Sequence, residues 1–191
     1  MLAISSNPGG ALAHMSGPGM NEGVAGVIHP FMTPAHVLVL LGIGLLLGQQ
    51  FSRHFKTALL TFASAAAVTL LLTTTRWVAS VPPSVLLSIA LAAGAMVALE
   101  TSLSTVSTVA IFAAAAVALG FDSGVEIGTA RKVVETLLGT WLGLTVGLTN
   151  IAFGAALVAE KKKKWMSIGL RIAGSWLVAI SLLALAFSLR K

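Results

Sequence analysis

Two histidines, His29 and His36, precede or begin a long apolar stretch and are the residues best suited to bind a metal. Neutral imidazole is a common ligand of divalent transition metals. On a continuous helix the two side chains would lie about 10 Å apart, too far to share one ion. Pro30 and Pro34 each disfavour helical geometry in the residue before them, so the chain can turn here. The prolines therefore make a site shared by both imidazoles possible.

Thr33 and Pro34 mark the expected start of the helix that carries His36. Threonine is a favoured N-cap residue, and proline is favoured at the first helical position. His36 would then lie in the first turn, near unpaired backbone N–H groups and the positive end of the helix dipole. This environment favours the neutral imidazole, which is the form that binds metals.

The composition indicates a membrane protein. Of the 191 residues, 57% are hydrophobic and 9% are charged, and the mean hydropathy is +0.96. The net charge of +6 does not indicate nucleic-acid binding, because Lys161 to Lys164 supply four of the twelve basic residues and the others lie near expected helix ends. The chain has no cysteine, which excludes disulfides, thiolate metal sites and cysteine nucleophiles.

The apolar runs predict an all-α integral membrane protein, a bundle of about six transmembrane helices. The expected ranges are about 34–50, 56–75, 83–100, 103–120, 132–159 and 165–189. Residues 1–28 are rich in Gly, Ser, Asn and Pro, so we expect an exported flexible segment, irregular until about Gly23, before a transmembrane domain over residues 29–191. The first ten residues do not make a signal peptide, although Ala11-Leu12-Ala13 resembles the end of one.

The basic residues predict the orientation in the membrane. Arg53, Lys56 and the four lysines from Lys161 to Lys164 belong to loops on one side of the expected bundle. The positive-inside rule then places this polylysine loop in the cytoplasm and both termini outside. We expect the membrane to be the inner (plasma) membrane of a bacterium. His29 and His36 would lie near the outer face, where they could capture a solute.

Three glycines, Gly139, Gly143 and Gly147, recur at four-residue spacing in the expected helix 132–159. Small residues at this spacing allow another helix to approach closely. The stripe is therefore a candidate surface for a homo-oligomer or for a larger membrane complex.

The segment from His29 to His36, HPFMTPAH, resembles the H-P-x-x-G-x-D-H signature of the HupE/UreJ family. These small membrane proteins are regarded as nickel or cobalt permeases. Both histidines and the first proline keep their spacing, whereas Thr33 stands where the signature has glycine and Ala35 where it has aspartate.

A second signature of the family, H-G-H-A-H-G-x-E, falls on residues 119–126, LGFDSGVE. Gly120, Gly124 and Glu126 match it, whereas its three histidines are replaced and Asp122 is new. The resemblance gives Glu126 a place in a metal site. With Asp122 it would add oxygen ligands to His29 and His36, making a mixed site for nickel or cobalt, and the methionines nearby would also suit copper. We expect Gly120 and Gly124 to form a turn.

The resemblance implies a permease for a divalent transition metal. The alternative is a non-transporting accessory subunit of a larger membrane complex, favoured by the missing signature histidines and by the glycine stripe. A permease predicts polar groups that converge on a path through the bundle, and an accessory subunit predicts a dry bundle. We do not expect an enzyme, because no nucleophile–base pair, cofactor loop or metalloprotease motif is present.

Overall fold

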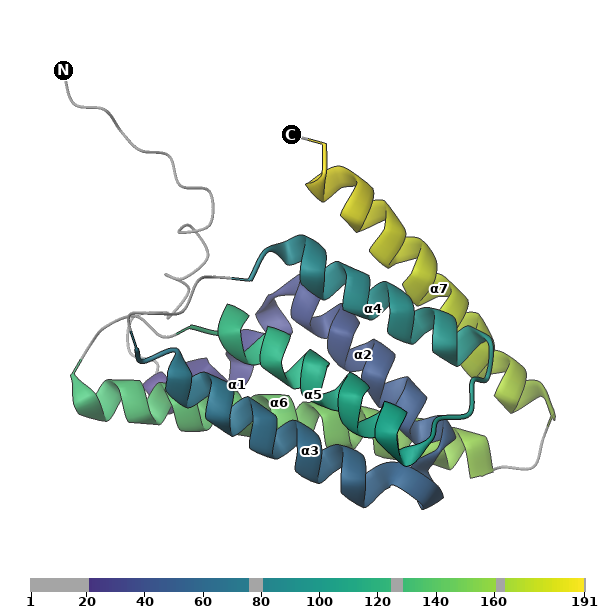
Figure 1. Ribbon diagram of the computed structural model, residues 1–191, viewed down its shortest axis with the longest axis horizontal. Coiled ribbons are helices and arrows are strands. Elements are labelled where there is room, and N and C mark those ends of the chain that lie inside the picture. Colours follow the sequence, from purple (N-terminus) through teal and green to yellow (C-terminus); the bar gives the residue numbers. More distant parts are fainter. Residues whose placement is uncertain (1–20, 76–80, 125–128, 161–163, 191) are drawn as a thin grey trace.

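The computed structural model describes residues 21–75, 81–124, 129–160 and 164–190, and in these ranges it contains helices only (Figure 1). They are α1 (Glu22–Met32), α2 (Pro34–Gln49), α3 (Phe51–Leu72), α4 (Pro83–Ala98), α5 (Thr105–Asp122), α6 (Ala130–Glu160) and α7 (Lys164–Ser188). From α2 to α7 the helices alternate in direction, as Figure 1 shows. The prediction of an all-α membrane bundle is confirmed.

The six expected helices correspond to α2 through α7, but they are not equally suited to span a bilayer. Helices α3, α5, α6 and α7 are each long and apolar enough to cross it alone. Helices α1 and α2 meet that criterion only together, as a pair of helices bent by 75°, the geometry of a broken span or of a re-entrant loop. Helix α4 is apolar but has 16 residues, or about 24 Å, less than the ~30 Å hydrocarbon layer.

Helix α2 lies at the centre of the bundle and contacts every other helix. It is apolar on all sides, which is the pattern of a helix that is buried all round. Gly42 lies against α4, where an added Cβ would come within 2.9 Å of Ala93. Gly44 lies against α6, where an added Cβ would come within 2.5 Å of Ile151. The stretch that carries His36 is therefore held from several directions at once.

Two boundaries differ from the prediction. Helix α3 begins at Phe51 rather than near Lys56, and Gln50 alone separates it from α2, with its side chain bonded to Thr101 and Leu103. Helix α5 continues through Gly120, which was expected to form a turn. Gly120 packs against the side chain of Thr69 on α3, so the glycine allows close helix contact and does not end the helix.

Helix α1 was not predicted. The side-chain oxygen of Asn21 caps it by accepting a hydrogen bond from Gly23 N at 2.8 Å. Glu22, in its first turn, pairs with Lys132 of α6 at 2.9 Å. The boundary that we expected at residue 28 falls inside α1, so residues 22–28 belong to the bundle. Residues 1–20 lie outside the described ranges.

The glycine stripe of α6 receives α1 of the same chain. A Cβ on Gly139 would collide with the carbonyl oxygen of Gly23, and a Cβ on Gly143 with that of Val27. One turn further, Gly147 lies against the ring of Phe31. The close helix contact expected from the stripe is present, but the helix that fills it comes from within the chain. An oligomer or larger complex stays a prediction.

Candidate metal site

A sharp bend between α1 and α2 brings the two candidate histidines together. Thr33, the residue between the helices, is extended (φ −95°, ψ 111°), as expected before a proline. It occupies the N-cap position of α2, although its side chain makes no capping hydrogen bond. His29 lies in the last turn of α1 and His36 in the first turn of α2, and their ring centroids are 5.8 Å apart in an edge-to-face arrangement. Their expected proximity is confirmed.

Pro30 lies inside α1, so it is not the point at which the chain turns. It removes one backbone N–H from the last turn of α1, and the break follows three residues later at Thr33. Of the two prolines, Pro34 determines where the bend occurs.

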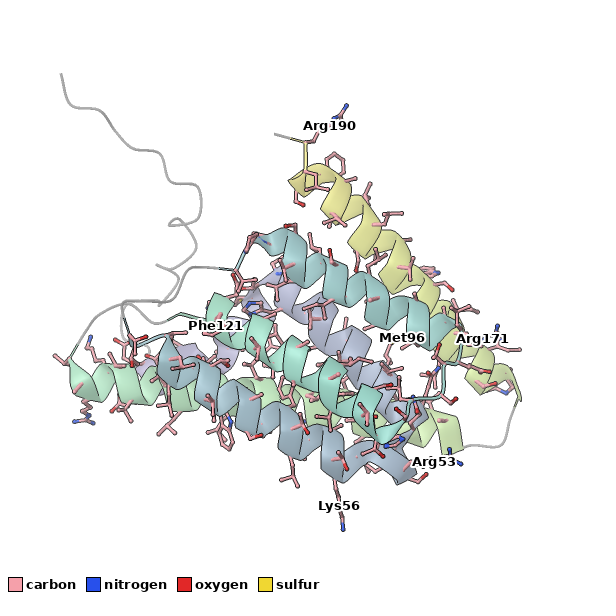
Figure 2. All side chains as sticks on the ribbon, viewed as in Figure 1. Arg53, Lys56, Met96, Phe121, Arg171 and Arg190 are labelled. Carbon is pink, nitrogen blue, oxygen red and sulfur yellow. The ribbon has the colours of Figure 1, made fainter. Side chains whose placement is uncertain are left out.

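Asp122, the last residue of α5, contacts His36. Its Oδ2 lies 2.8 Å from Nε2 of His36, whose side chain is fully buried, whereas the Asp122 side chain keeps 23% of its surface exposed. Figure 2 labels the preceding residue, Phe121, at this end of the bundle. A carboxylate at this distance accepts the Nε2–H of a neutral imidazole and fixes the orientation of the ring.

The second ring nitrogen of His36 is available to a ligand. When Nε2 donates to Asp122, the lone pair of the neutral ring is on Nδ1. Nδ1 is buried and has no hydrogen-bond partner among the described residues. A histidine that binds a metal through one nitrogen commonly donates from the other to a carboxylate, and the Asp122–His36 pair has this form. In this arrangement Nδ1 is the nitrogen through which His36 would bind an ion, and the Asp122 carboxylate contacts the other ring nitrogen. Direct metal binding by Asp122 stays a prediction.

The described residues do not contain a complete metal site. No three His, Asp or Glu side chains within them are arranged so that they could hold one ion. His29 and His36 supply two imidazoles, and Asp122 is engaged with His36. Glu126, the fourth candidate, lies outside the described residues. Its part in the site stays a prediction.

Two further ionisable residues, Arg131 and His54, have structural partners outside the proposed site. Arg131 pairs with Glu135 at 2.7 Å one turn along α6. His54 lies on α3, at the opposite end of the bundle, where its Nε2 is 3.0 Å from the carbonyl oxygen of Leu103. His54 is therefore not close to His29 or His36.

An apolar layer separates His36 from the far end of α2. Val39, Leu40 and Ile43 follow His36 along the helix and are fully buried. At the far end, Gln49 and Glu100 line a pocket of about 280 Å³. Arg53, Lys56 and Arg171 also lie toward that end, as Figure 2 shows. The bundle thus has polar groups at both ends and an apolar seal between them.

The sequence contained a signal for one feature that was missed, helix α1. Asn21 followed by Glu22 is a cap and an acidic first turn, the usual start of a helix, and it preceded α1. The resemblance grouped Asp122 with His36 in one site, and the structure places their side chains in contact. The hydrogen bond itself spans 86 residues and had no local signal, because it depends on how α5 packs beside α2.

One of the comparisons with known proteins gives a match. Residues 2–185 match a family model described as HupE / UreJ protein. No curated protein and no solved structure matches the chain. The family is associated with nickel or cobalt transport or with accessory functions. Because the match covers nearly the whole chain, this membrane protein belongs to the HupE/UreJ family.

Proposed function

We propose that the protein is a permease for a divalent transition metal, nickel or cobalt, and that it captures the ion at His29 and His36. The observation that carries the proposal is the unpartnered, buried Nδ1 of His36 beside the second imidazole, with Nε2 committed to Asp122. An unpaired polar atom is costly inside a membrane protein, and a bound ion would satisfy it.

The broken helix supports this proposal. Interrupted helices near a binding site are common in membrane transporters, because irregular backbone is tolerated where protein surrounds it. Here the break at Thr33 lies between the two imidazoles. Arg53, Lys56 and Arg171 lie at the far end of the bundle (Figure 2), which supports an orientation with the His36 end outside and the far end in the cytoplasm. The ion would then enter at His36 and leave toward the pocket beside Gln49.

Passage requires the apolar layer of Val39, Leu40 and Ile43 to open. These side chains are fully buried, so the structure corresponds to a closed state in this proposal. A permease that alternates between two openings needs such a seal in at least one of its states. The sequence has no nucleotide-binding loop, so movement would follow a gradient of the metal or of another ion.

The test is a binding titration of the detergent-purified protein with nickel and cobalt, followed by uptake into liposomes that contain a metal-sensitive dye. We expect one ion for each chain, and we expect His29→Ala/His36→Ala to abolish both binding and uptake. The matched control is His54→Ala, which removes a histidine from the opposite end and should leave binding unchanged. Stoichiometric binding that survives the double substitution would reject the site.

A second candidate is a non-transporting accessory subunit, and the dry interior favours it. The main core cluster, around Leu40, Phe62 and Phe112, is apolar. The liposome assay separates the candidates. Binding without uptake, in protein shown to be correctly folded, would support an accessory role, whereas uptake by the isolated protein would exclude a need for a larger complex.

A further inference from the structure

The outward face of α6 is apolar except for one carboxamide. Six large apolar side chains on this helix are exposed: Val134, Leu138, Leu142, Val146, Phe153 and Leu157. Asn150 lies among them and is also exposed. Between Glu135 and Glu160 the helix has no charged residue, and Asn150 is about 4 Å along the axis from the middle of that stretch. Its amide therefore lies deep in the hydrocarbon layer.

The Asn150 side chain is only partly satisfied by its own helix. Its Nδ2 donates to the carbonyl oxygen of Val146 at 2.8 Å. Its Oδ1 accepts no hydrogen bond from any described residue, because the N–H groups of a helix interior are used by the backbone. Lipid chains offer no donor, so this acceptor and the second N–H of the amide lack partners in a monomer.

Exposed hydroxyl groups on other helices can donate their hydrogen within their own helix, so they leave no N–H or O–H donor without a partner. Ser64 on α3, Ser88 on α4 and Ser175 on α7 each donate to a carbonyl oxygen one turn earlier in the same helix. A hydroxyl has one hydrogen, and its own helix can accept it. An asparagine also presents a carbonyl acceptor, which its own helix cannot satisfy. The requirement for an outside partner is thus a property of Asn150.

The surface around Asn150 allows a second helix to approach. Gly154 is one turn further along the same face, and a Cβ added there would meet nothing within 4 Å. On the other side of Asn150, a groove of about 280 Å³ runs between α1 and α6 and is lined by apolar residues that include Phe31 and Val146. The open glycine admits a helix backbone, and the groove admits a side chain from it.

We propose that this face of α6 binds a second copy of the same chain, with the two Asn150 amides hydrogen-bonded to each other across a two-fold axis. A carboxamide is self-complementary, because its N–H pairs with the C=O of its copy, as an isologous interface requires. The stripe of Gly139, Gly143 and Gly147 is occupied by α1, so it does not compete for this role. The proposal does not depend on metal binding.

The test is energy transfer between donor-labelled and acceptor-labelled protein in phosphatidylethanolamine–phosphatidylglycerol liposomes at increasing dilution in lipid. We expect a dimer for the wild type and at least a tenfold weaker association for Asn150→Leu. Asn150→Gln keeps a carboxamide and should retain most of the association. Ser64→Leu removes an exposed polar group from α3 and should have no effect.

A second measurement locates the interface. The chain has no cysteine, so Val146→Cys gives a single thiol one turn from Asn150, and oxidation should cross-link two copies. Leu60→Cys, 70% exposed on α3, should not cross-link. A wild type that stays monomeric at every dilution, or an Asn150→Leu protein that associates as the wild type does, would overturn the proposal. In a monomer, lipid would cover the outward face of α6, including Asn150.

Discussion

In the proposed site, Asp122 contacts His36 through one hydrogen bond. The carboxylate accepts from Nε2 of His36 at 2.8 Å and so directs the free lone pair of the ring to Nδ1. The family signature has an aspartate where this chain has Ala35, and the chain instead brings a carboxylate to His36 from α5. Asp122 thus supplies the histidine with a negative partner from a different helix.

Asp122→Asn tests this role. The amide can still accept a hydrogen bond but has no charge, so we expect His36 to be oriented less firmly and the metal affinity to fall roughly 10- to 100-fold. The titration described for the double histidine variant measures this change. Glu135→Gln, which removes a carboxylate from the same end, is the control and should bind as the wild type does. Complete loss of binding in Asp122→Asn would instead make Asp122 a direct ligand.

At the scale of the elements, the site depends on how α1 is held. Helix α1 has 11 residues, which is too short to be stable in isolation, and its contact with the glycines of α6 keeps it in place. That contact fixes His29 on α1 against His36 on α2. A change at the glycine stripe should therefore act on the metal site from a distance.

Gly143→Ala tests the contact between α1 and α6. The new Cβ would collide with the backbone oxygen of Val27, so we expect a loss of about 1–3 kcal/mol in stability and a weaker metal affinity. Thermal unfolding in detergent, followed by circular dichroism, and the metal titration measure the two effects.

Gly169→Ala on α7 is the matched control. The added Cβ meets nothing within 4 Å there, and the same substitution should stabilise the helix by about 0.5–1 kcal/mol. A gain in stability at both positions would show that α1 does not pack on the stripe in solution.

At the scale of the whole molecule, the orientation in the membrane decides what the site can do. Arg53, Lys56 and Arg171 lie at one end of the bundle, whereas Arg190 lies away from it (Figure 2). We propose that the Arg53 end faces the cytoplasm, as the four lysines at 161–164 in the sequence favour. The His36 end would then face outward and receive an ion from outside the cell.

Single cysteines in the cysteine-free chain test the orientation. Thr129→Cys lies at the His36 end and Ser102→Cys at the opposite end, and both positions are exposed. We expect a membrane-impermeant maleimide to label Thr129→Cys in intact cells and Ser102→Cys only after permeabilisation. Labelling of Ser102→Cys in intact cells, with Thr129→Cys labelled only after permeabilisation, would place the histidines at the cytoplasmic face. Export of the metal ion would then be the direction of transport to test.

The sequence by itself determined the class of the fold and most of its helices. Apolar runs of the right length identify buried or lipid-facing helices without knowledge of their neighbours. Lipid requires each spanning segment to satisfy its own backbone hydrogen bonds, and a helix does so within the segment. Pro34 likewise predicted the bend, because its effect on Thr33 is local. Gly139 and Gly143 predicted a close helix contact, although they did not identify α1 as the helix.

Only the tertiary structure decided which residues meet. Gly120 was expected to form a turn because glycine favours turns, but contact with Thr69 gives it a different role. Asp122 contacts His36 because α5 ends beside the start of α2, a consequence of packing with no trace in local spacing. The exposure of Asn150 on α6 likewise depends on which faces the other helices cover. Helix formation is governed by neighbours along the chain, whereas both the site and the free surface depend on side chains that are distant in sequence.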